Sequence, residues 1–239
     1  MFEADHPVSA TGLNNFAHLI YLQGRYSKAE PHYKEALSIR CSMLGTDHPN
    51  TATSQNNLAL LYYAQGRYSE AEPLYANALS TRRHVLGSDH PETSTSLNNL
   101  ALLYYAQGQY SDAEPLYDEA LSIRRRVLGW NHPDKGISLS NLACLYSSQG
   151  RNSDAEPLFE DSLSIHRRVL GADHPDTVTS LNNLAFLYES QGRYSKAEPL
   201  YQEAVEIVEQ MLGAEHPNTK IVRENYERLL AEMKEKGAE

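Results

Sequence analysis

Histidine is the residue whose type and spacing first suggest chemistry in this chain, because imidazole is a common ligand of transition metals. A His-Pro pair recurs every 42 residues, as His6-Pro7, His48-Pro49, His90-Pro91, His132-Pro133, His174-Pro175 and His216-Pro217. Since each pair holds the same place in its own repeat, the histidines are not expected to gather around one ion. They are predicted to have a structural role where a helix begins, and no metal or other cofactor is expected.

The two cysteines, Cys41 and Cys144, are the candidate nucleophiles. Cys144 has no evident histidine partner in its own repeat, and the chain shows no phosphate-binding loop and no carboxylate pair outside the repeat pattern. The cysteines lie about two and a half repeats apart, which is too far for a disulfide in an elongated array, so reduced thiols are expected. The sequence therefore does not predict an enzyme.

Clustered arginines are the third candidate, at Arg82-Arg83, Arg124-Arg125-Arg126 and Arg167-Arg168. Guanidinium groups pair with carboxylates, so the clusters could hold an acidic peptide. They also fall in the last turns of predicted helices, where positive charge complements the helix dipole. A solvated, dipole-complementing face is the favoured interpretation.

Composition limits the class of partner. The 239-residue chain is 41% hydrophobic and carries a net charge of -10, which argues against nucleic acid as the main partner. No run is long and apolar enough to span a membrane, and the N-terminus has no signal-peptide pattern. We therefore expect a cytoplasmic protein that has no membrane segment.

Each 42-residue repeat is predicted to contain two helices, here called helix A and helix B. Helix A should begin just after His-Pro, with Asn50, Asp134, Asp176 and Asn218 as N-caps, and end at a glycine such as Gly66. Helix B should open with a capping box, for which the pairs are Ser27 with Glu30, Ser69 with Glu72, Ser111 with Glu114, Ser153 with Glu156 and Ser195 with Glu198. A proline such as Pro73 follows each box and is predicted to end the first turn.

The apolar positions that join the two helices also carry a family resemblance. In the second repeat they include Leu58-Ala59, Tyr62, Gly66, Tyr68, Ala71, Tyr75 and Ala78. This pattern resembles tetratricopeptide repeats, and the length of 42 residues with Leu-Asn-Asn-Leu-Ala, Ala-Glu-Pro-Leu-Tyr and Leu-Gly-x-Asp-His-Pro is similar to the kinesin light chain class. The resemblance implies an all-α fold, a right-handed α-solenoid of antiparallel helix pairs that forms a superhelix.

The repeat predicts the division of the chain. Five units are expected at about 8–49, 50–91, 92–133, 134–175 and 176–217, and a C-terminal capping helix and tail at 219–239. The last helix has a polar face and an apolar face that includes Val222 and Leu229, as expected of a solenoid cap. Met1 to Pro7 begins inside a loop between repeats, so the chain is expected to be a fragment of a longer protein or an engineered array.

In the family, the A helices line a concave groove, and the resemblance implies the same groove here. Positions i, i+3, i+7 and i+10 of helix A share one face. The candidate peptide-binding residues are Asn14, Tyr21, Thr53, Asn56, Leu60, Tyr63, Thr95, Asn98, Leu102, Tyr105, Asn182 and Phe186. The strongest binding is expected in the second and third repeats.

Two interpretations of the asparagines stay open. A carboxamide has donors and an acceptor, so a row of Asn could grip an extended peptide backbone. The same side chains could instead pair between neighbouring A helices. We expect groove contact from the first Asn of each pair and a structural role for the second, at Asn15, Asn57, Asn99, Asn141, Asn183 and Asn225. Tyr63 and Tyr105 could serve packing or binding.

The fourth repeat departs most from the others. Gly136 stands early in its helix A, where glycine costs about 1 kcal/mol relative to alanine, so this repeat is predicted to be the least stable. Trp130, in the preceding turn, could be a contact residue or a covered loop residue.

These observations favour a protein-interaction module that binds a short extended peptide of a protein partner, with an aromatic-acidic motif as the family suggests. A spacer or self-associating module of a larger protein is the alternative, as is a consensus-like array without a ligand. A binder should expose the groove Asn and Tyr side chains, whereas a spacer should have them paired among themselves.

Overall fold

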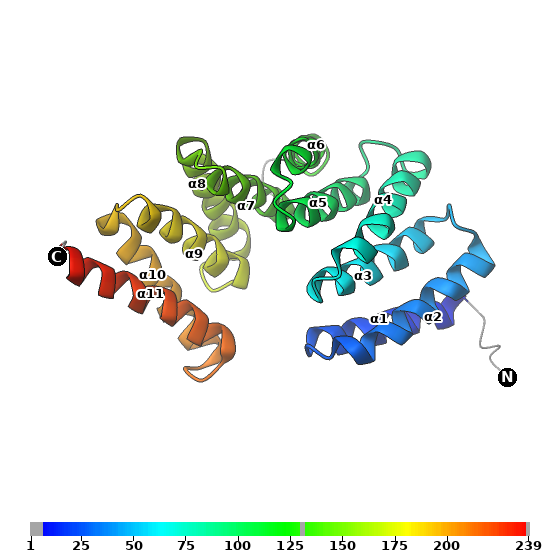
Figure 1. Cartoon of the computed structure of the whole chain (residues 1–239), viewed down its shortest axis with the longest axis horizontal. Helices are drawn as coiled ribbons and strands as arrows, with labels where there is room; N and C mark the ends of the chain where they lie inside the picture. Colours follow the sequence, from blue (N-terminus) through cyan, green and yellow to red (C-terminus); the bar gives the residue numbers. More distant parts are fainter. Residues whose placement is uncertain (1–6, 130–131, 238–239) are drawn as a thin grey trace. The chain divides into compact units, whose positions relative to one another are not determined.

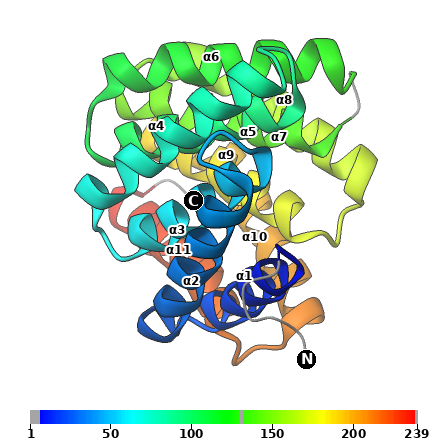
Figure 2. The same ribbon diagram turned by 90° about the vertical axis from the view of Figure 1, so that its right-hand side faces the viewer.

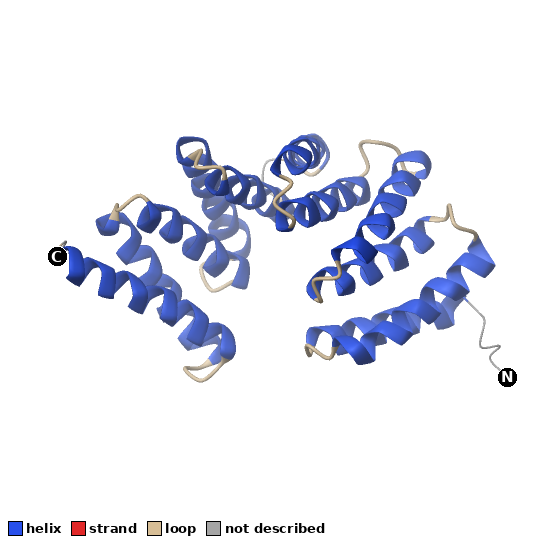
Figure 3. Cartoon of the chain, viewed as in Figure 1, coloured by secondary structure: helices blue, strands red, loops and turns tan. Residues whose placement is uncertain are grey.

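The chain folds into helices joined by short loops (Figures 1 and 3). The computed structural model describes residues 7–129 and 132–237, and these residues form eleven helices and no strand. The chain divides into two compact units, Met1–Val127 and Leu128–Glu239.

The first unit contains three helix pairs. They are α1 (Pro7–Leu22) with α2 (Tyr26–Leu44), α3 (Pro49–Ala64) with α4 (Tyr68–Val85), and α5 (Pro91–Ala106) with α6 (Tyr110–Val127). The two helices of a pair lie side by side in both views (Figures 1 and 2). Helix B of one pair packs on helix A of the next, and successive A helices also touch. The pairs therefore stack, as expected of a solenoid.

The second unit repeats this arrangement. It contains α7 (Pro133–Ser148) with α8 (Asn152–Leu170), α9 (Pro175–Ser190) with α10 (Tyr194–Leu212), and the unpaired α11 (Pro217–Lys236). α8 packs on α9, α7 touches α9, and α11 covers α10. Within each unit, the predicted all-α solenoid of antiparallel helix pairs is confirmed.

One buried aromatic residue per repeat anchors each helix pair. Tyr33, Tyr75, Tyr117, Phe159 and Tyr201 occur at intervals of 42 residues on helix B and are at most 3% exposed. Fully buried alanines such as Ala71 and Ala78 flank this side chain and let the helices approach. Burying a large apolar side chain contributes roughly 1.5–3 kcal/mol, so this position is a main source of stability in every repeat.

The repeated histidines cap helix A. His48 is the N-cap of α3, Pro49 is its first residue, and the backbone N–H of Asn50 donates to His48 Nδ1 at 3.1 Å. The same bond occurs at His90, His132, His174 and His216. The structural role predicted for these histidines is confirmed, and His6 lies outside the described residues. The predicted N-caps Asn50, Asp134, Asp176 and Asn218 are wrong, because each lies inside the first turn and donates its own N–H.

The predicted capping boxes of helix B are also wrong in four repeats. The N-caps there are Arg25, Arg67, Arg151 and Arg193, and none of them makes a side-chain cap hydrogen bond. A tight loop causes this shift. Gly66 has a φ of +72° and its N–H donates to Tyr63 O, and the Arg67 N–H donates to Tyr62 O. The residue that bonds back to the last turn of α3 is therefore also the N-cap of α4.

The repeated proline lies deeper in helix B than predicted. Pro73 is the sixth residue of α4, which begins at Tyr68, so it stands in the second turn. Proline has no N–H to donate, and its side chain lies at the exposed surface of the helix.

Candidate peptide-binding surface

The predicted groove residues lie on α1, α3, α5 and α9, but their environments differ. The first asparagines of the first three repeats, Asn14, Asn56 and Asn98, are buried, with exposed fractions of 6%, 8% and 7%. Asn182 on α9 is partly buried. Burial removes most of the surface with which these side chains could meet a peptide.

The asparagines are hydrogen-bonded between successive A helices. Asn57 Nδ2 donates to Asn14 Oδ1 at 3.2 Å, and Asn99 Nδ2 donates to Asn56 Oδ1 at 2.9 Å. In the second unit, Asn225 Nδ2 donates to Asn182 Oδ1 at 2.9 Å. We call these contacts the asparagine ladder. The structural role predicted for the second Asn is seen at these positions, and the first Asn is engaged in the same bonds.

The threonine candidates also make hydrogen bonds within the stack. Thr53 Oγ1 donates to Pro49 O at 3.1 Å and accepts from Arg82 Nη2 at 3.2 Å. Thr95 Oγ1 donates to Pro91 O at 3.3 Å. The Thr53 hydroxyl therefore joins its own helix to the following helix B.

A partly exposed tyrosine surface remains at the C-terminal ends of α1, α3 and α5. Each helix A tyrosine packs against the first residue of its helix B, with ring centroids 5.3 Å apart for Tyr21 and Tyr26, and 5.7 Å apart for both Tyr63 with Tyr68 and Tyr105 with Tyr110. Leu60 and Leu102, one turn earlier, are also partly exposed.

The tyrosines of adjacent repeats lie close enough to affect one another. Burial raises the pKa of Tyr63, and the neighbouring Tyr68, Tyr105 and Tyr21 raise it further. The Tyr63 phenol therefore stays neutral at physiological pH and can donate a hydrogen bond.

The second unit has no equivalent aromatic surface within its described residues. Ser147 holds the register of Tyr63 on α7, and Glu189 holds it on α9. Glu189 is only 7% exposed, because it accepts from Tyr201 at 2.8 Å and from Arg228 at 3.0 Å. Phe186 is 52% exposed, and the Arg228 guanidinium lies 5.8 Å from its ring centroid.

The arginine clusters were predicted to form a solvated face. This prediction is wrong for Arg82 in the first cluster and for Arg124 in the second. Arg82 and Arg124 are each 4% exposed, and Arg40, at the same register in the first repeat, is 5% exposed. The exposed neighbours Arg83 and Arg126 pair with Glu119 and Asp89.

Arg82 joins three helices at what we call an arginine junction. Its Nη1 donates to Ser96 Oγ at 2.8 Å and to Glu92 O at 3.3 Å on α5, and its Nη2 donates to Thr53 Oγ1 on α3. Arg40 makes the equivalent bonds to Ser54 Oγ, Asn50 O and Thr11 Oγ1. An arginine repeated every 42 residues, with a serine 14 residues after it, was the signal that could have revealed these junctions.

His166 replaces the arginine in the fourth repeat. Its Nδ1 lies 2.8 Å from Ser180 Oγ, and its Nε2 lies 3.2 Å from Pro133 O. A Cβ added at Gly136 would lie 2.3 Å from His166 Nε2. Gly136 therefore makes room for the imidazole, which gives this helix-weakening residue a packing role.

Ion pairs between an arginine and a glutamate of the preceding repeat form a second set of contacts that the sequence did not predict. Arg67 Nη1 lies 2.7 Å from Glu30 Oε2 of the preceding repeat, and its guanidinium lies 4.1 Å from the ring centroid of Tyr62. The hydrogen bond from Arg67 lowers the pKa of Glu30, against the opposing effect of burial. Arg193 repeats the arrangement with Glu156 and Tyr188. The recurring Gly-Arg pair after helix A was the available signal.

The chemistry of the other candidates is limited. The described residues hold no group of three His, Cys, Asp or Glu side chains that could bind a metal ion. None of the described helices is long and apolar enough to cross a membrane. Both thiols are free. Burial raises the pKa of Cys41, and it raises the pKa of Cys144 to about 11.

Trp130, which was predicted to be either a contact residue or a covered loop residue, lies outside the described residues.

Comparison with known structures places this fold beside kinesin-light-chain-like repeat proteins. One crystal structure, of the nearly identical TPR-like repeats of a Podosopora anserina kinesin light chain candidate, is 26% identical, covers 88% of this chain and 99% of that chain, and has a TM-score of 0.71. BtubC (BKLC) from P. vanneervenii is 27% identical, with coverages of 88% and 84% and a TM-score of 0.72. Pseudomonas aeruginosa pilF, at 17% identity and a TM-score of 0.61, shares the fold over 95% of this chain and 90% of its own.

Sequence comparisons identify the family. Comparison with curated protein sequences gives no match. The profile of the tetratricopeptide repeat matches residues 8–80, 52–126, 97–168, 149–210 and 183–238, which together cover nearly the whole chain. With its 42-residue period and its helix pairs, the chain belongs to the tetratricopeptide repeat family, and its resemblance to the kinesin light chain class is confirmed.

Proposed function

We propose that this chain binds a short extended peptide of a partner protein on the A-helix face of its first unit. Tetratricopeptide repeats are generally protein–protein interaction modules, and the kinesin-light-chain-like relatives are typically scaffolds without enzymatic activity. The observation that carries the finer proposal is the tyrosine surface, where rings from three repeats are partly exposed beside Leu60 and Leu102.

The chemistry of this surface suits an aromatic anchor. Tyr63 and Tyr105 offer ring faces for offset or edge-to-face packing, and each adds a hydroxyl that can bond the peptide backbone. Tyrosine is enriched among the residues that dominate binding energy at protein interfaces. Arg82 and Arg124 are buried, so they do not offer their charge to an acidic peptide. The acidic half of the aromatic-acidic motif therefore rests on the family resemblance.

The asparagines have a lesser part in the proposed binding than their spacing suggested. Asn56 and Asn99 join α3 to α5 through the ladder, so they help to set the spacing of Tyr63 and Tyr105. The peptide would then contact the tyrosine and leucine positions, with Thr53, Thr95 and the ladder forming the floor beneath.

A spacer or self-associating module is the second candidate, and two observations favour it. The groove asparagines are paired among themselves, as expected of a spacer. Phe16 and Leu19 on α1 are 51% and 60% exposed, whereas Leu58 and Leu61 at the same register of α3 are 4% and 0% exposed. The face of α1 that corresponds to a buried repeat interface is therefore open, and a second copy could cover it.

The test is a fluorescence-polarisation screen of the chain against peptides that include tryptophan- and tyrosine-centred acidic motifs. The variant is Tyr63→Ser/Tyr105→Ser, because Ser147 holds this register in the fourth repeat. The control is Asn77→Ala/Ser122→Ala, at exposed positions of the B helices α4 and α6. Loss of two anchors worth about 1 kcal/mol or more each should weaken binding by roughly thirtyfold, with the control unchanged.

The alternative gives a different outcome. If no peptide binds, or if Tyr63→Ser/Tyr105→Ser does not change the affinity, the proposal that the tyrosine surface binds a peptide fails. A concentration-dependent sedimentation coefficient that Phe16→Ser/Leu19→Ser abolishes would then support self-association.

A further inference from the structure

The junction between α10 and α11 has no arginine at the register of Arg82. Val208 on α10 holds the register of Arg82, Val222 on α11 holds that of Ser96, and Val178 on α9 holds that of Ala52. The three valines are 5% (Val178), 4% (Val208) and 9% (Val222) exposed. A charged, hydrogen-bonded junction is thus replaced by an apolar one.

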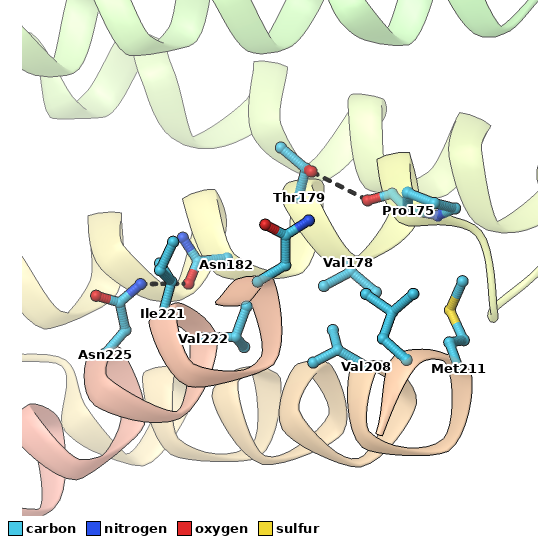
Figure 4. Close-up of a pocket in the computed structure, with 11 residues that line it drawn as sticks. Pro175, Val178, Thr179, Asn182, Val208, Met211, Ile221, Val222 and Asn225 are labelled. Carbon is cyan, nitrogen blue, oxygen red and sulfur yellow. Dashed lines mark hydrogen bonds between the residues drawn. The ribbon is translucent and has the colours of Figure 1, made fainter. Parts of the chain in front are cut away.

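A cavity of about 240 Å³ lies at this junction, between α9, α10 and α11 (Figure 4). Its lining includes Val222, Asn218 and Thr179, the counterparts of the three residues that accept hydrogen bonds from Arg82. The cavity therefore occupies the place that a long side chain fills at the arginine junctions. Val208 is too short to reach those positions.

The wall of the cavity is apolar and its rim is mixed. Met211, Leu212 and Ile221 continue the apolar lining and are 38%, 43% and 56% exposed. The carboxamides of Asn182 and Asn225 also line it, joined by the ladder bond that Figure 4 marks. Exposed apolar side chains around a hollow are typical of binding sites.

We propose that this cavity binds a long aliphatic side chain, leucine or methionine, from an extended peptide segment of a partner protein. A long side chain already fills the equivalent space at the arginine junctions, which sets the length of the occupant. The occupant is apolar, because Val222 offers no acceptor where Ser96 accepts from Arg82, and an unpaired buried charge would be costly. The rim carboxamides have N–H groups beyond the one that the ladder bond uses, and these suit a peptide carbonyl oxygen.

This site is distinct from the tyrosine surface and does not depend on it. The tyrosine surface lies on α1, α3 and α5, and the cavity lies in the second unit. The two proposals can therefore fail separately.

The chain provides its own probe and its own control. Met211 lines the cavity, and Met43 holds the same register beside the arginine junction of Arg40. Methyl-¹³C methionine labelling of the full chain reports on both sites in one spectrum. The probes are N-acetyl-leucine amide, with N-acetyl-lysine amide and N-acetyl-glycine amide as controls.

N-acetyl-leucine amide is expected to shift the Met211 methyl signal saturably and to leave that of Met43 in place. The lysine and glycine probes should shift neither. In Val178→Ala/Val208→Arg/Val222→Ser, which reproduces the Arg82 junction, the apparent affinity should fall by about tenfold or more, because the apolar contact is lost.

A milder variant keeps the test decisive if the triple variant does not fold. Ile221→Thr changes a 56% exposed side chain to the residue found at this register in α3, α5 and α9, and it should weaken leucine binding severalfold. Equal shifts with the glycine probe, equal shifts at Met43, no shift with leucine, or full binding by the folded variants would each overturn the proposal.

Discussion

The arginine junction makes a quantitative prediction about what holds the repeats together. Arg82→Ala removes three hydrogen bonds from a charged donor and leaves Ser96 Oγ without the guanidinium that it accepts from at 2.8 Å. Burial lowers the pKa of Arg82, yet an arginine stays charged at neutral pH, so the native junction contains a buried cation. Because Arg82→Ala removes the charge itself and leaves a neutral buried acceptor unpaired, it should cost about 1–3 kcal/mol.

Removing both partners should cost much less. Arg82→Val/Ser96→Val copies the Val208 and Val222 pair of the junction between α10 and α11 and leaves neither a buried charge nor an unpaired hydroxyl. Apolar replacement of a whole buried polar pair is often close to neutral, so the double variant should be about 2 kcal/mol more stable than Arg82→Ala.

The assay is urea unfolding followed by circular dichroism, with hydrogen exchange of α4 and α5 to locate the change. Arg83→Ala is the matched control, because Arg83 is the next residue, is exposed and pairs only at the surface with Glu119. It should cost no more than about 0.5 kcal/mol. The reasoning is refuted if Arg82→Ala costs under 1 kcal/mol or if the double variant is as unstable as the single one.

Three further outcomes follow from individual sites. Gly136→Ala should lower the midpoint of thermal unfolding although alanine favours a helix, because the added Cβ would lie 2.3 Å from His166 Nε2. Gly136→Ser/His166→Arg should restore that midpoint, because it removes the imidazole that the Cβ would meet. Glu30→Gln should lower the free energy of unfolding at pH 7, and this loss should shrink as the pH falls below 4.5. The pKa of Glu30 is held below its ordinary 4.5 by its arginine partner, so the stabilisation is present above pH 4.5 and is lost as pH falls through the lowered pKa. Cys144 should react more slowly than Cys41 with a thiol reagent at pH 8, because burial raises the pKa of Cys144 to about 11, and equal rates would contradict this.

The sequence predicted the helices well because their signals are local and repeated. The period of 42 residues, the glycine after helix A and the alanine and tyrosine positions of helix B indicated which residues lie on which helix. The misplaced caps were errors of two residues. For helix A, His48 Nδ1 accepts the N–H of Asn50, so the cap is the histidine and not the asparagine. For helix B, the tight loop after helix A makes Arg67 the N-cap in place of Ser69.

The contacts between repeats were harder to predict because their partners are distant in sequence. Arg82 bonds to residues 14 positions after it and 29 positions before it, and helical periodicity does not show which side chain reaches across the gap. The asparagine ladder has the same origin, since its partners are 43 residues apart. The cavity beside Val208 arises from three substitutions that coincide only after the repeats stack.

The central claim is that asparagines hold the A helices together and tyrosines meet the partner, and one crossed measurement tests it. Asn99→Ala and Tyr63→Ser/Tyr105→Ser would be compared by urea unfolding and by polarisation with a peptide found in the screen. Asn99→Ala should lower stability by about 1 kcal/mol and leave the peptide affinity of the folded chain unchanged. The tyrosine variant should lose affinity and keep its helicity. Loss of affinity in the asparagine variant, with full affinity in the tyrosine variant, would contradict the claim.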